Sequence, residues 1–163
     1  MKLSTKQLCV TAVFAAMVFA VTRLIQIPIP GGYFNIGNSI ILACCAVLPC
    51  PGGIIAGSIG SALADLTSYP VYTLPTLVIK ALMPLVFYLI VNKAKPASFK
   101  RYMLASAVST LIPLVGYTLT GCVLYGSFVG GLAQVPGLLL EYAANLILLA
   151  IVLPQLIHRK FWD

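Results

Sequence analysis

The sequence has few charged residues, and this scarcity excludes a soluble globular domain. Charged residues make up 8% of the 163 positions, with three acidic residues and one histidine, whereas hydrophobic residues make up 61%. Soluble domains carry about 25% charged residues, so lipid must surround most of this chain. Because a spanning helix needs about 20 apolar residues, the length allows at most about six crossings. The sequence therefore predicts a single all-α, membrane-spanning bundle over residues 1–163.

Motifs of common catalytic and metal sites are also missing. The five cysteines form no C-x-x-C pair and lie within or beside apolar runs, so we interpret them as small buried hydrophobic residues (Cys9, Cys44, Cys45, Cys50 and Cys122). The single histidine, His158, has no acidic neighbour in the sequence, and no phosphate-binding loop ends in Lys-Ser or Lys-Thr. We expect no enzyme activity, no metal and no cofactor, and an ATP-driven process would need another chain.

Six apolar segments run along the chain, at about 5–27, 38–50, 52–66, 74–92, 102–124 and 136–158. The second and third are short and are separated by the helix-breaking run PCPGG, so they form either two tilted helices or a re-entrant pair. The first follows two lysines, as a signal peptide does. Because it has no small-residue cleavage pattern before the next segment, we expect it to remain as a helix of the mature protein.

Basic residues mark one side of the predicted bundle. They occur near the N-terminus, in the stretch 93–101 (KAKPASFKR) and near the C-terminus, whereas the connections at about 28–37, 67–73 and 125–135 contain no Lys or Arg. The positive-inside rule therefore places both termini and the stretch 93–101 in the cytoplasm, which agrees with six crossings. This topology explains the net charge of +7 better than a nucleic-acid partner does, and Trp162 is typical of an interfacial anchor.

Four ionisable residues lie within or at the ends of the apolar segments: Arg23, Asp65, Lys80 and Glu141. A charge in hydrocarbon costs roughly 2.5 to 3.5 kcal/mol on insertion scales, so such residues usually face a cavity. In the predicted orientation all four lie in the outer half of the membrane. They form either a ligand site or a structural network that pairs Asp65 with Lys80, or Arg23 with Glu141. For Arg23 alone, snorkelling to the outer headgroups is the favoured interpretation.

The predicted outer connections are rich in aromatic residues. Tyr33 and Phe34 follow a Pro-Gly-Gly turn, Tyr69 and Tyr72 lie in SYPVYTLP, and the third connection contains Tyr125 and Phe128. Each residue alone is typical of an interfacial belt. Together, above a charged cluster, they favour a lid and a stacking surface for a flat ring. The Pro-Gly-Gly loop has the turn residues of a gate, and an ordinary tight connection has the same residues.

Small residues recur on two of the predicted helices. The first carries Ala12, Ala16 and Ala20 at four-residue spacing, and the third carries Gly53, Gly57, Gly60 and Ala64. Small side chains on one face allow another helix to approach closely. We expect one of these faces to pack inside the bundle and the other to be offered to a partner protein.

Several of these pieces occur together in one known family. They are the run IPGGYFNIGN, the glycine-rich stretch ending in Ala64-Asp65-Leu66, Tyr69-Pro70, Ile79-Lys80, the alanine series and VPGLLLEYAAN from Val135 to Asn145. In these pieces the chain resembles the substrate-specific S component of energy-coupling factor (ECF) vitamin transporters, particularly the riboflavin-type family. It departs from the pattern at Asn38, where Asp is usual, and at Leu138 and Glu141, where Asn and Gln are common.

The resemblance implies a six-helix subunit of the prokaryotic plasma membrane that captures a vitamin from outside. It also implies a membrane-embedded coupling subunit, docked on Ala12, Ala16 and Ala20, and two cytoplasmic ATPases. We predict a substrate site formed by Tyr33, Phe34, Asn38, Asp65, Tyr69, Tyr72, Lys80, Glu141 and Asn145. A hydroxymethylpyrimidine or pyridoxine-like compound suits these residues, and riboflavin is the next candidate. The alternative is a small channel or scaffold subunit with no tight ligand.

Overall fold

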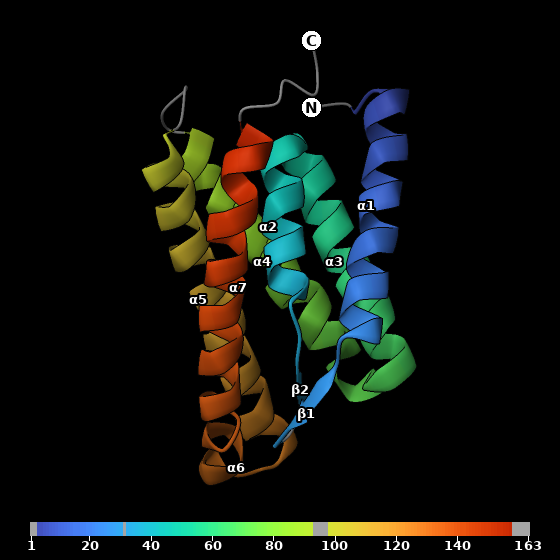
Figure 1. Cartoon of the computed structure of the whole chain (residues 1–163). Coiled ribbons are helices and arrows are strands. Elements are labelled where there is room, and N and C mark those ends of the chain that lie inside the picture. The colour runs from blue at the N-terminus through green and yellow to red at the C-terminus, as the bar shows by residue number, and fades with distance from the viewer. Residues whose placement is uncertain (1–2, 31, 93–97, 158–163) are drawn as a thin grey trace.

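The computed structural model describes residues 3–30, 32–92 and 98–157, and most of these residues are helical (Figure 1). In chain order the elements are α1 (Thr5–Leu24), β1 (Ile27–Ile29), β2 (Gly32–Phe34), α2 (Gly37–Val47), α3 (Cys50–Ser68), the 3₁₀ helix η1 (Pro70–Tyr72), α4 (Thr73–Asn92), α5 (Phe99–Leu124), α6 (Phe128–Leu132) and α7 (Val135–Ile157). Each of the six predicted segments contains a helix, so the predicted all-α bundle is confirmed. The two-stranded hairpin was not predicted.

Four stretches are long and apolar enough to span a bilayer: Thr5–Leu24, Pro70–Val91, Phe99–Leu124 and Phe128–Ile157. The helix α2 has 11 residues and rises only about 16 Å, roughly half the hydrocarbon thickness. The strand β2 leads into it from the hairpin (Figure 1). Extended backbone therefore precedes α2 on the hairpin side of the bundle.

The start of α1, the end of α7 and the facing ends of α4 and α5 lie at one end of the bundle (Figure 1). The hairpin, η1 and α6 lie at the other end, which we call the hairpin end. This arrangement agrees with the predicted sidedness, while the orientation in the cell stays a prediction. Part of the expected signal lies outside the described residues, namely Lys2, Lys93, Lys95, His158, Arg159, Lys160 and Trp162.

Local signals in the sequence explain how the first elements begin. Ser4 caps α1 in a capping box, in which its side chain accepts from the Gln7 N–H and the Gln7 side chain accepts from the Ser4 N–H. After α1, the strands β1 and β2 pair antiparallel, with Ile27 opposite Phe34. Pro28 has no N–H to continue a helix, so the chain leaves α1 in extended form and turns back toward the bundle.

The glycine face of α3 packs inside the bundle, against α1 and other helices. A Cβ at Gly60 would lie 2.5 Å from the carbonyl oxygen of Ala15, and a Cβ at Gly52 would lie 2.7 Å from the Thr11 hydroxyl. Neither contact leaves room for a side chain, which explains the close approach of the two helices. Of the two small-residue faces, the glycine series is therefore the internal one.

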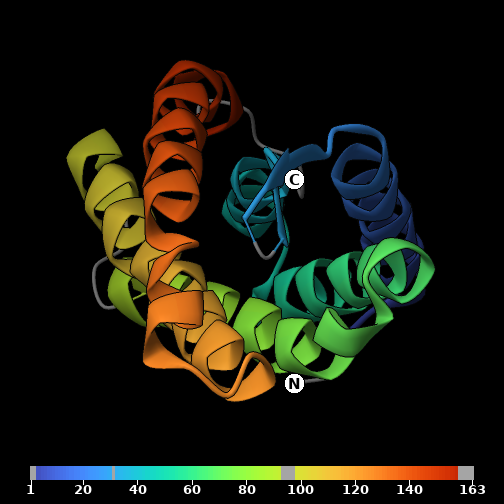
Figure 2. The same ribbon diagram turned by 90° about the horizontal axis from the view of Figure 1, so that it is seen from below.

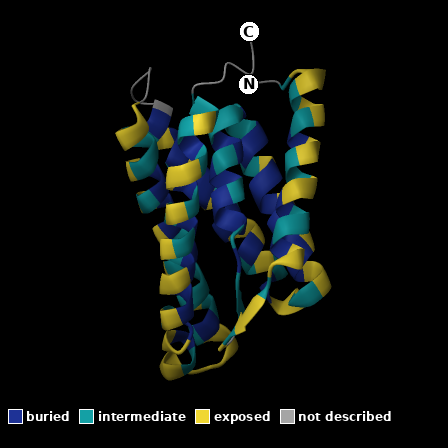
Figure 3. Cartoon of the chain, viewed as in Figure 1, coloured by how far each residue is buried: buried dark blue, intermediate teal, exposed yellow. Residues whose placement is uncertain are grey.

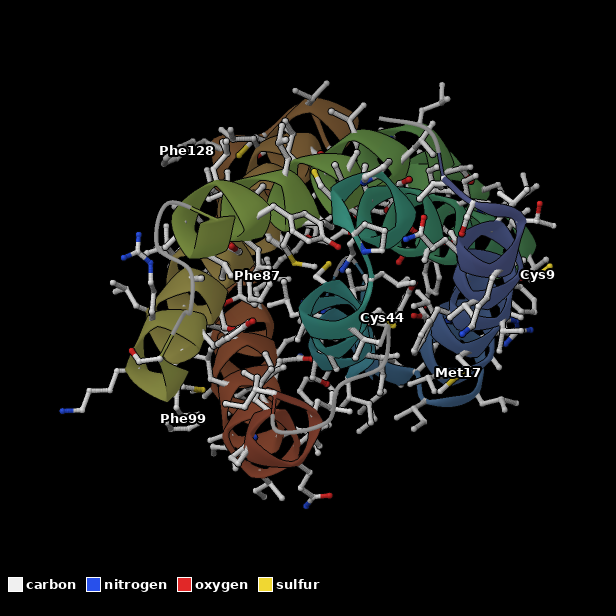
Figure 4. The ribbon with its side chains drawn as sticks, turned by 90° about the horizontal axis from the view of Figure 1, so that it is seen from above. Cys9, Met17, Cys44, Phe87, Phe99 and Phe128 are labelled. Carbon is white, nitrogen blue, oxygen red and sulfur yellow. The ribbon has the colours of Figure 1, made fainter. Side chains whose placement is uncertain are left out.

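The apolar core fills the half of the bundle away from the hairpin. Phe87, Ile41 and Leu149 are fully buried there, and Figure 4 shows Phe87 and Cys44 inside the ring of helices with Cys9 on its outside. Exposed residues run along the outside of the helices (Figure 3), and many of them are large and apolar, as a lipid-facing surface requires. Cys44 and Cys45 are buried with the core, as expected, whereas Cys9 is exposed.

Candidate ligand pocket

A pocket lies at the hairpin end of the bundle, enclosed by the hairpin and by α1, α3, α4, α5 and α7. Seen from this end, the hairpin lies between α1 and α7 (Figure 2). Six of the predicted site residues line the pocket: Tyr33, Asp65, Tyr69, Tyr72, Lys80 and Glu141. These residues come from β2, α3, η1 and its N-cap, α4 and α7, so folding brings them together.

Asp65 on α3 is held by two hydroxyl groups. The Tyr33 hydroxyl of β2 donates to one carboxylate oxygen and the Thr76 hydroxyl of α4 donates to the other. Burial raises the pKa of the Tyr33 phenol above its usual value, and the nearby Asp65 charge adds to this effect. The Tyr33 phenol therefore keeps its proton and acts as a donor. The Thr76 hydroxyl has one proton, and it donates this proton to Asp65. In the contact between Thr76 Oγ1 and the Tyr117 hydroxyl, 3.0 Å apart, Tyr117 is therefore the donor.

Lys80 on α4 and Glu141 on α7 are joined through Asn38 at the start of α2. The Lys80 ammonium donates to Asn38 Oδ1, and Asn38 Nδ2 donates to Glu141 Oε1 at 2.8 Å. The Lys80 ammonium can only donate hydrogen bonds, and the Glu141 carboxylate can only accept them. The Asn38 side-chain amide therefore bonds to both when its oxygen faces Lys80 and its NH2 group faces Glu141. Lys80 Nζ also lies 5.4 Å from the centroid of the Tyr117 ring, which is a cation–π distance.

The three charged side chains are deeply buried, since Asp65, Lys80 and Glu141 are 2%, 2% and 3% exposed. Arg23 is exposed and stands apart from this cluster, which fits its interpretation as a snorkelling residue. The Arg23–Glu141 pair considered from the sequence is not formed. Two acids therefore face one base inside the pocket, and an anionic ligand would meet an excess of negative charge.

Aromatic rings form the outer wall of the pocket. Tyr33 and Tyr69 have ring centroids 5.2 Å apart with a tilt of 36°, and Tyr72 meets Tyr117 edge to face at 6.2 Å. Gln134 donates to the Tyr72 hydroxyl at 3.3 Å. The hairpin and η1 thus place several π faces beside the charged cluster, where a flat ring could stack.

Three other predicted site residues do not line the pocket described here: Phe34, Asn38 and Asn145. Asn38 is the bridge behind it. Asn145 on α7 holds the backbone that leads into α2, because Nδ2 donates to the Asn35 carbonyl at 3.0 Å and Oδ1 accepts from the Ser39 N–H at 2.7 Å. It therefore satisfies backbone groups at the junction of extended chain and helix.

Sequence reasoning missed several residues that line the pocket, namely Thr22, Ile29, Asn35, Ser61, Thr76, Tyr117, Gln134 and Leu138. A signal was present for Thr76, which lies one turn before Lys80 on the same helix. Tyr117 is a phenol in the middle of an apolar segment and could have been noticed for that reason. Leu138 stands where the family pattern commonly has a polar residue, and nothing in the local sequence singles out the others.

The cavity between these side chains has a volume of about 30 Å³, which is room for about two water molecules. An organic ligand therefore requires some of the lining side chains to move apart. The hairpin contacts the bundle here through the Tyr33–Asp65 hydrogen bond, the Tyr33–Tyr69 ring pair and the packing of Ile29 against Gly137 of α7.

A second concave surface lies on the outside, between α1 and α3. This groove has a volume of about 590 Å³ and is lined by Leu8, Thr11, Ala12, Ala15, Ala16, Phe19, Ile55, Ile59, Leu63, Leu66 and Thr67. Ala12 and Ala16 are exposed in it, while Ala20 is not among its lining residues. The alanine face thus points away from the core, with two of its three predicted members in the groove.

Residues 2–158 match the family model described as ECF-type riboflavin transporter, S component. An uncharacterized protein in the gap 3′ region of Pyrococcus woesei is 35% identical over 108 residues, covering 64% of this chain and 71% of that protein. A solved structure described as the S component of a bacterial ECF transporter superposes with a TM-score of 0.70 at 17% identity, covering 93% of this chain and 95% of the other, and so shares the fold. The chain belongs to the family of S components of ECF-type riboflavin transporters.

Proposed function

We propose that this S component captures a vitamin or vitamin precursor with a flat heteroaromatic ring, and that the pocket at the hairpin end holds it. The observation that carries the proposal is the burial of Asp65, Lys80 and Glu141 beside several tyrosine rings in an otherwise apolar bundle. Charge inside a membrane is expensive and is mostly retained for function. A ring that stacks on the tyrosines and hydrogen-bonds to these groups would make use of both features.

Riboflavin is one candidate ligand, supported by the description of the family. A hydroxymethylpyrimidine or pyridoxine-like compound is the other, because a smaller ring needs less movement of the pocket wall than a three-ring system does. Both candidates are neutral or nearly so, which suits a pocket with two acids and one base. A phosphorylated form would meet Asp65 and Glu141 without a second cation to balance it.

We further propose that the groove between α1 and α3 receives a membrane-embedded coupling subunit, and that two ATPase subunits drive transport from the cytoplasm. The groove is apolar and bordered by the small side chains of Ala12 and Ala16, which permits close approach of a partner helix. The cell location proposed is the plasma membrane of a prokaryote. A channel is disfavoured, because buried Phe87, Ile41 and Leu149 fill the half of the bundle that a polar path would have to cross.

The proposal is tested by releasing small molecules from the purified protein and identifying them by mass spectrometry. Riboflavin, hydroxymethylpyrimidine and pyridoxine are then titrated into the emptied protein. We expect one of them to bind tightly, and Lys80→Ala and Glu141→Ala to weaken that binding at least tenfold. Gln155→Ala, which removes an exposed polar side chain from α7, is the control and should bind as the wild type does.

Two results would contradict the proposal in different ways. Folded Lys80→Ala and Glu141→Ala variants that keep full affinity would show that the ligand binds elsewhere. A wild-type protein that retains no small molecule and binds none of the three probes would remove the vitamin proposal and favour the scaffold alternative.

A further inference from the structure

Two buried hydroxyl groups line the pocket without a hydrogen-bond partner among the described residues. They are Thr22 Oγ1 on α1 and Ser61 Oγ on α3, and the two side chains are only 2% and 1% exposed. Buried hydroxyls are nearly always bonded, so each exception calls for an explanation.

Neighbouring hydroxyls on the same helices behave differently. On α1 the Thr11 hydroxyl donates to the Gln7 carbonyl at 2.7 Å, and on α3 the Ser58 hydroxyl donates to the Ile54 carbonyl at 2.7 Å. Bonding to the carbonyl one turn earlier is the usual solution for Ser and Thr in an apolar helix. Thr22 and Ser61 do not adopt it, although the same kind of acceptor lies in their own helices. Their hydroxyl groups remain available to the pocket.

The two hydroxyls line the pocket from two helices, Thr22 from α1 and Ser61 from α3. Val18, one turn before Thr22, packs against Gly60, the residue before Ser61, so α1 and α3 are in contact beside the pocket. A side chain at Gly37 would collide with the Thr22 hydroxyl, and the glycine therefore leaves that hydroxyl its space. Lys80 of α4 packs against Gly57, one turn before Ser61, and Glu141 lines the pocket from α7.

The two hydroxyl groups themselves are neutral. A hydroxyl both donates and accepts, so the pair can bind a group that does the same. The nearest ionisable group on α3 is Asp65, one turn beyond Ser61, and its negative charge disfavours a phosphate or carboxylate there. An aliphatic group would leave both hydroxyls unpaired. A neutral hydroxyl group of the ligand can both donate and accept, brings no negative charge near Asp65 and gives the two protein hydroxyls a partner.

We propose that Thr22 and Ser61 form a subsite that hydrogen-bonds to a hydroxyl group of the ligand and so determines specificity for hydroxylated compounds. This rests on the proposed function, since it assumes that the pocket binds a vitamin-like ring. The rings and the charged cluster hold the heteroaromatic part, and the subsite holds its hydroxylated substituent. Because α1 and α3 also border the outer groove, the substituent would link the two helices that form that surface.

The test compares pairs of probes that differ only in hydroxyl content. Riboflavin is paired with lumiflavin, which has the same ring and a methyl group in place of the ribityl chain. Hydroxymethylpyrimidine is paired with its methyl analogue. We expect Thr22→Val and Ser61→Ala each to weaken binding of the hydroxylated probe by about threefold to tenfold, as loss of one neutral hydrogen bond does. Binding of the hydroxyl-free partner should stay as in the wild type.

Two further variants separate recognition from folding. Thr22→Ser keeps the hydroxyl and should keep the affinity for the hydroxylated probe. Ser109→Ala removes another buried, unpartnered hydroxyl that is not among the residues lining this pocket, and it should change neither affinity. Thermal unfolding without ligand should be no lower for Thr22→Val and Ser61→Ala than for the wild type, because no internal hydrogen bond is lost.

The failures of the two proposals can be told apart. Wild-type protein that binds none of riboflavin, hydroxymethylpyrimidine and pyridoxine overturns the proposed ligand class, and the subsite with it. Wild-type binding combined with unchanged affinity in folded Thr22→Val and Ser61→Ala overturns the subsite alone. An equal loss for both members of a probe pair also overturns it, since the hydroxyls would then be acting on the ring or on packing.

Discussion

The Tyr33 hydroxyl of the β1–β2 hairpin donates a hydrogen bond to the Asp65 carboxylate of α3. This contact fastens the hairpin over the pocket and gives a buried carboxylate one of its two described donors. A residue in a strand and a residue in a helix, 32 positions apart in the chain, thus meet at the candidate site.

Replacing Tyr33 by Phe tests this contact without removing the ring. The variant leaves one Asp65 oxygen without its donor, so we expect a loss of stability of about 1 to 3 kcal/mol, measured by thermal unfolding in detergent. Tyr69→Phe is the control, because Tyr69 contributes its ring to the same pair. Equal stability of Tyr33→Phe and the wild type would show that the contact contributes nothing measurable.

The Lys80–Asn38–Glu141 bridge predicts strongly non-additive substitutions. Lys80→Met leaves Glu141 buried with no cation, which we expect to lower stability by about 3 to 5 kcal/mol. The double variant Lys80→Met/Glu141→Gln should be more stable than Lys80→Met alone, because no unpaired charge of this pair remains. Lys100→Met, at an exposed position, is the control for removing a lysine. Additive losses in the double variant would argue against coupling through Asn38.

Asn145 is expected to be important for folding. Asn145→Leu leaves the Asn35 carbonyl and the Ser39 N–H without their partner, and we expect a loss of about 2 to 6 kcal/mol from these two groups. The loss should appear as a lower unfolding temperature and a lower yield of monodisperse protein. Gln155→Leu makes the same type of change at an exposed position of α7 and should be tolerated. A stable Asn145→Leu variant with impaired ligand binding would instead assign Asn145 to the ligand.

The outer groove gives a prediction that separates transport from binding. Ala12→Trp or Ala16→Trp fills the groove, so we expect vitamin uptake by cells to be abolished while the purified protein still binds its ligand. Val13→Trp places the same bulk on a side chain of α1 that is 61% exposed and is not among the groove-lining residues, and it should leave uptake intact. Loss of ligand binding in the Ala variants would mean that this face acts on the pocket.

Orientation in the membrane can be tested by labelling cysteines with a reagent that does not cross the bilayer. In a Cys9→Ser background, Ser127→Cys at the hairpin end should react in intact cells, and Lys100→Cys at the other end should react only after permeabilisation. Both positions are exposed. The reverse pattern would place the pocket on the cytoplasmic side and remove the model of capture from outside.

Much of the architecture could be predicted from the sequence. Scarcity of charge and six apolar runs indicate a helical membrane bundle, because unpaired charge and open backbone are not tolerated in lipid. The same reasoning selected Asp65, Lys80 and Glu141, which the structure brings together in one pocket. The spacing of alanines and glycines marked two close-packing faces. It could not say which face is internal, since that depends on the helix placed opposite.

The hairpin illustrates a limit of local signals. Its residues were interpreted as a turn with aromatic side chains, yet Ile27–Ile29 and Gly32–Phe34 pair as strands. This pairing carries Tyr33 onto Asp65 and leads extended chain into a short α2. A three-residue strand is too short to show the alternation by which strands are recognised, so only the completed bundle reveals it.

From composition and periodicity alone, the sequence indicates that lipid surrounds the chain, where the helices lie and which charged side chains need a partner. These properties depend on free energies of transfer and on local backbone geometry. The tertiary structure decided which groups satisfy one another. Asn38 between Lys80 and Glu141, Asn145 on the backbone before α2, and the unpaired hydroxyls of Thr22 and Ser61 are set by contacts between helices distant in the chain. Such contacts exist only once the helices have packed.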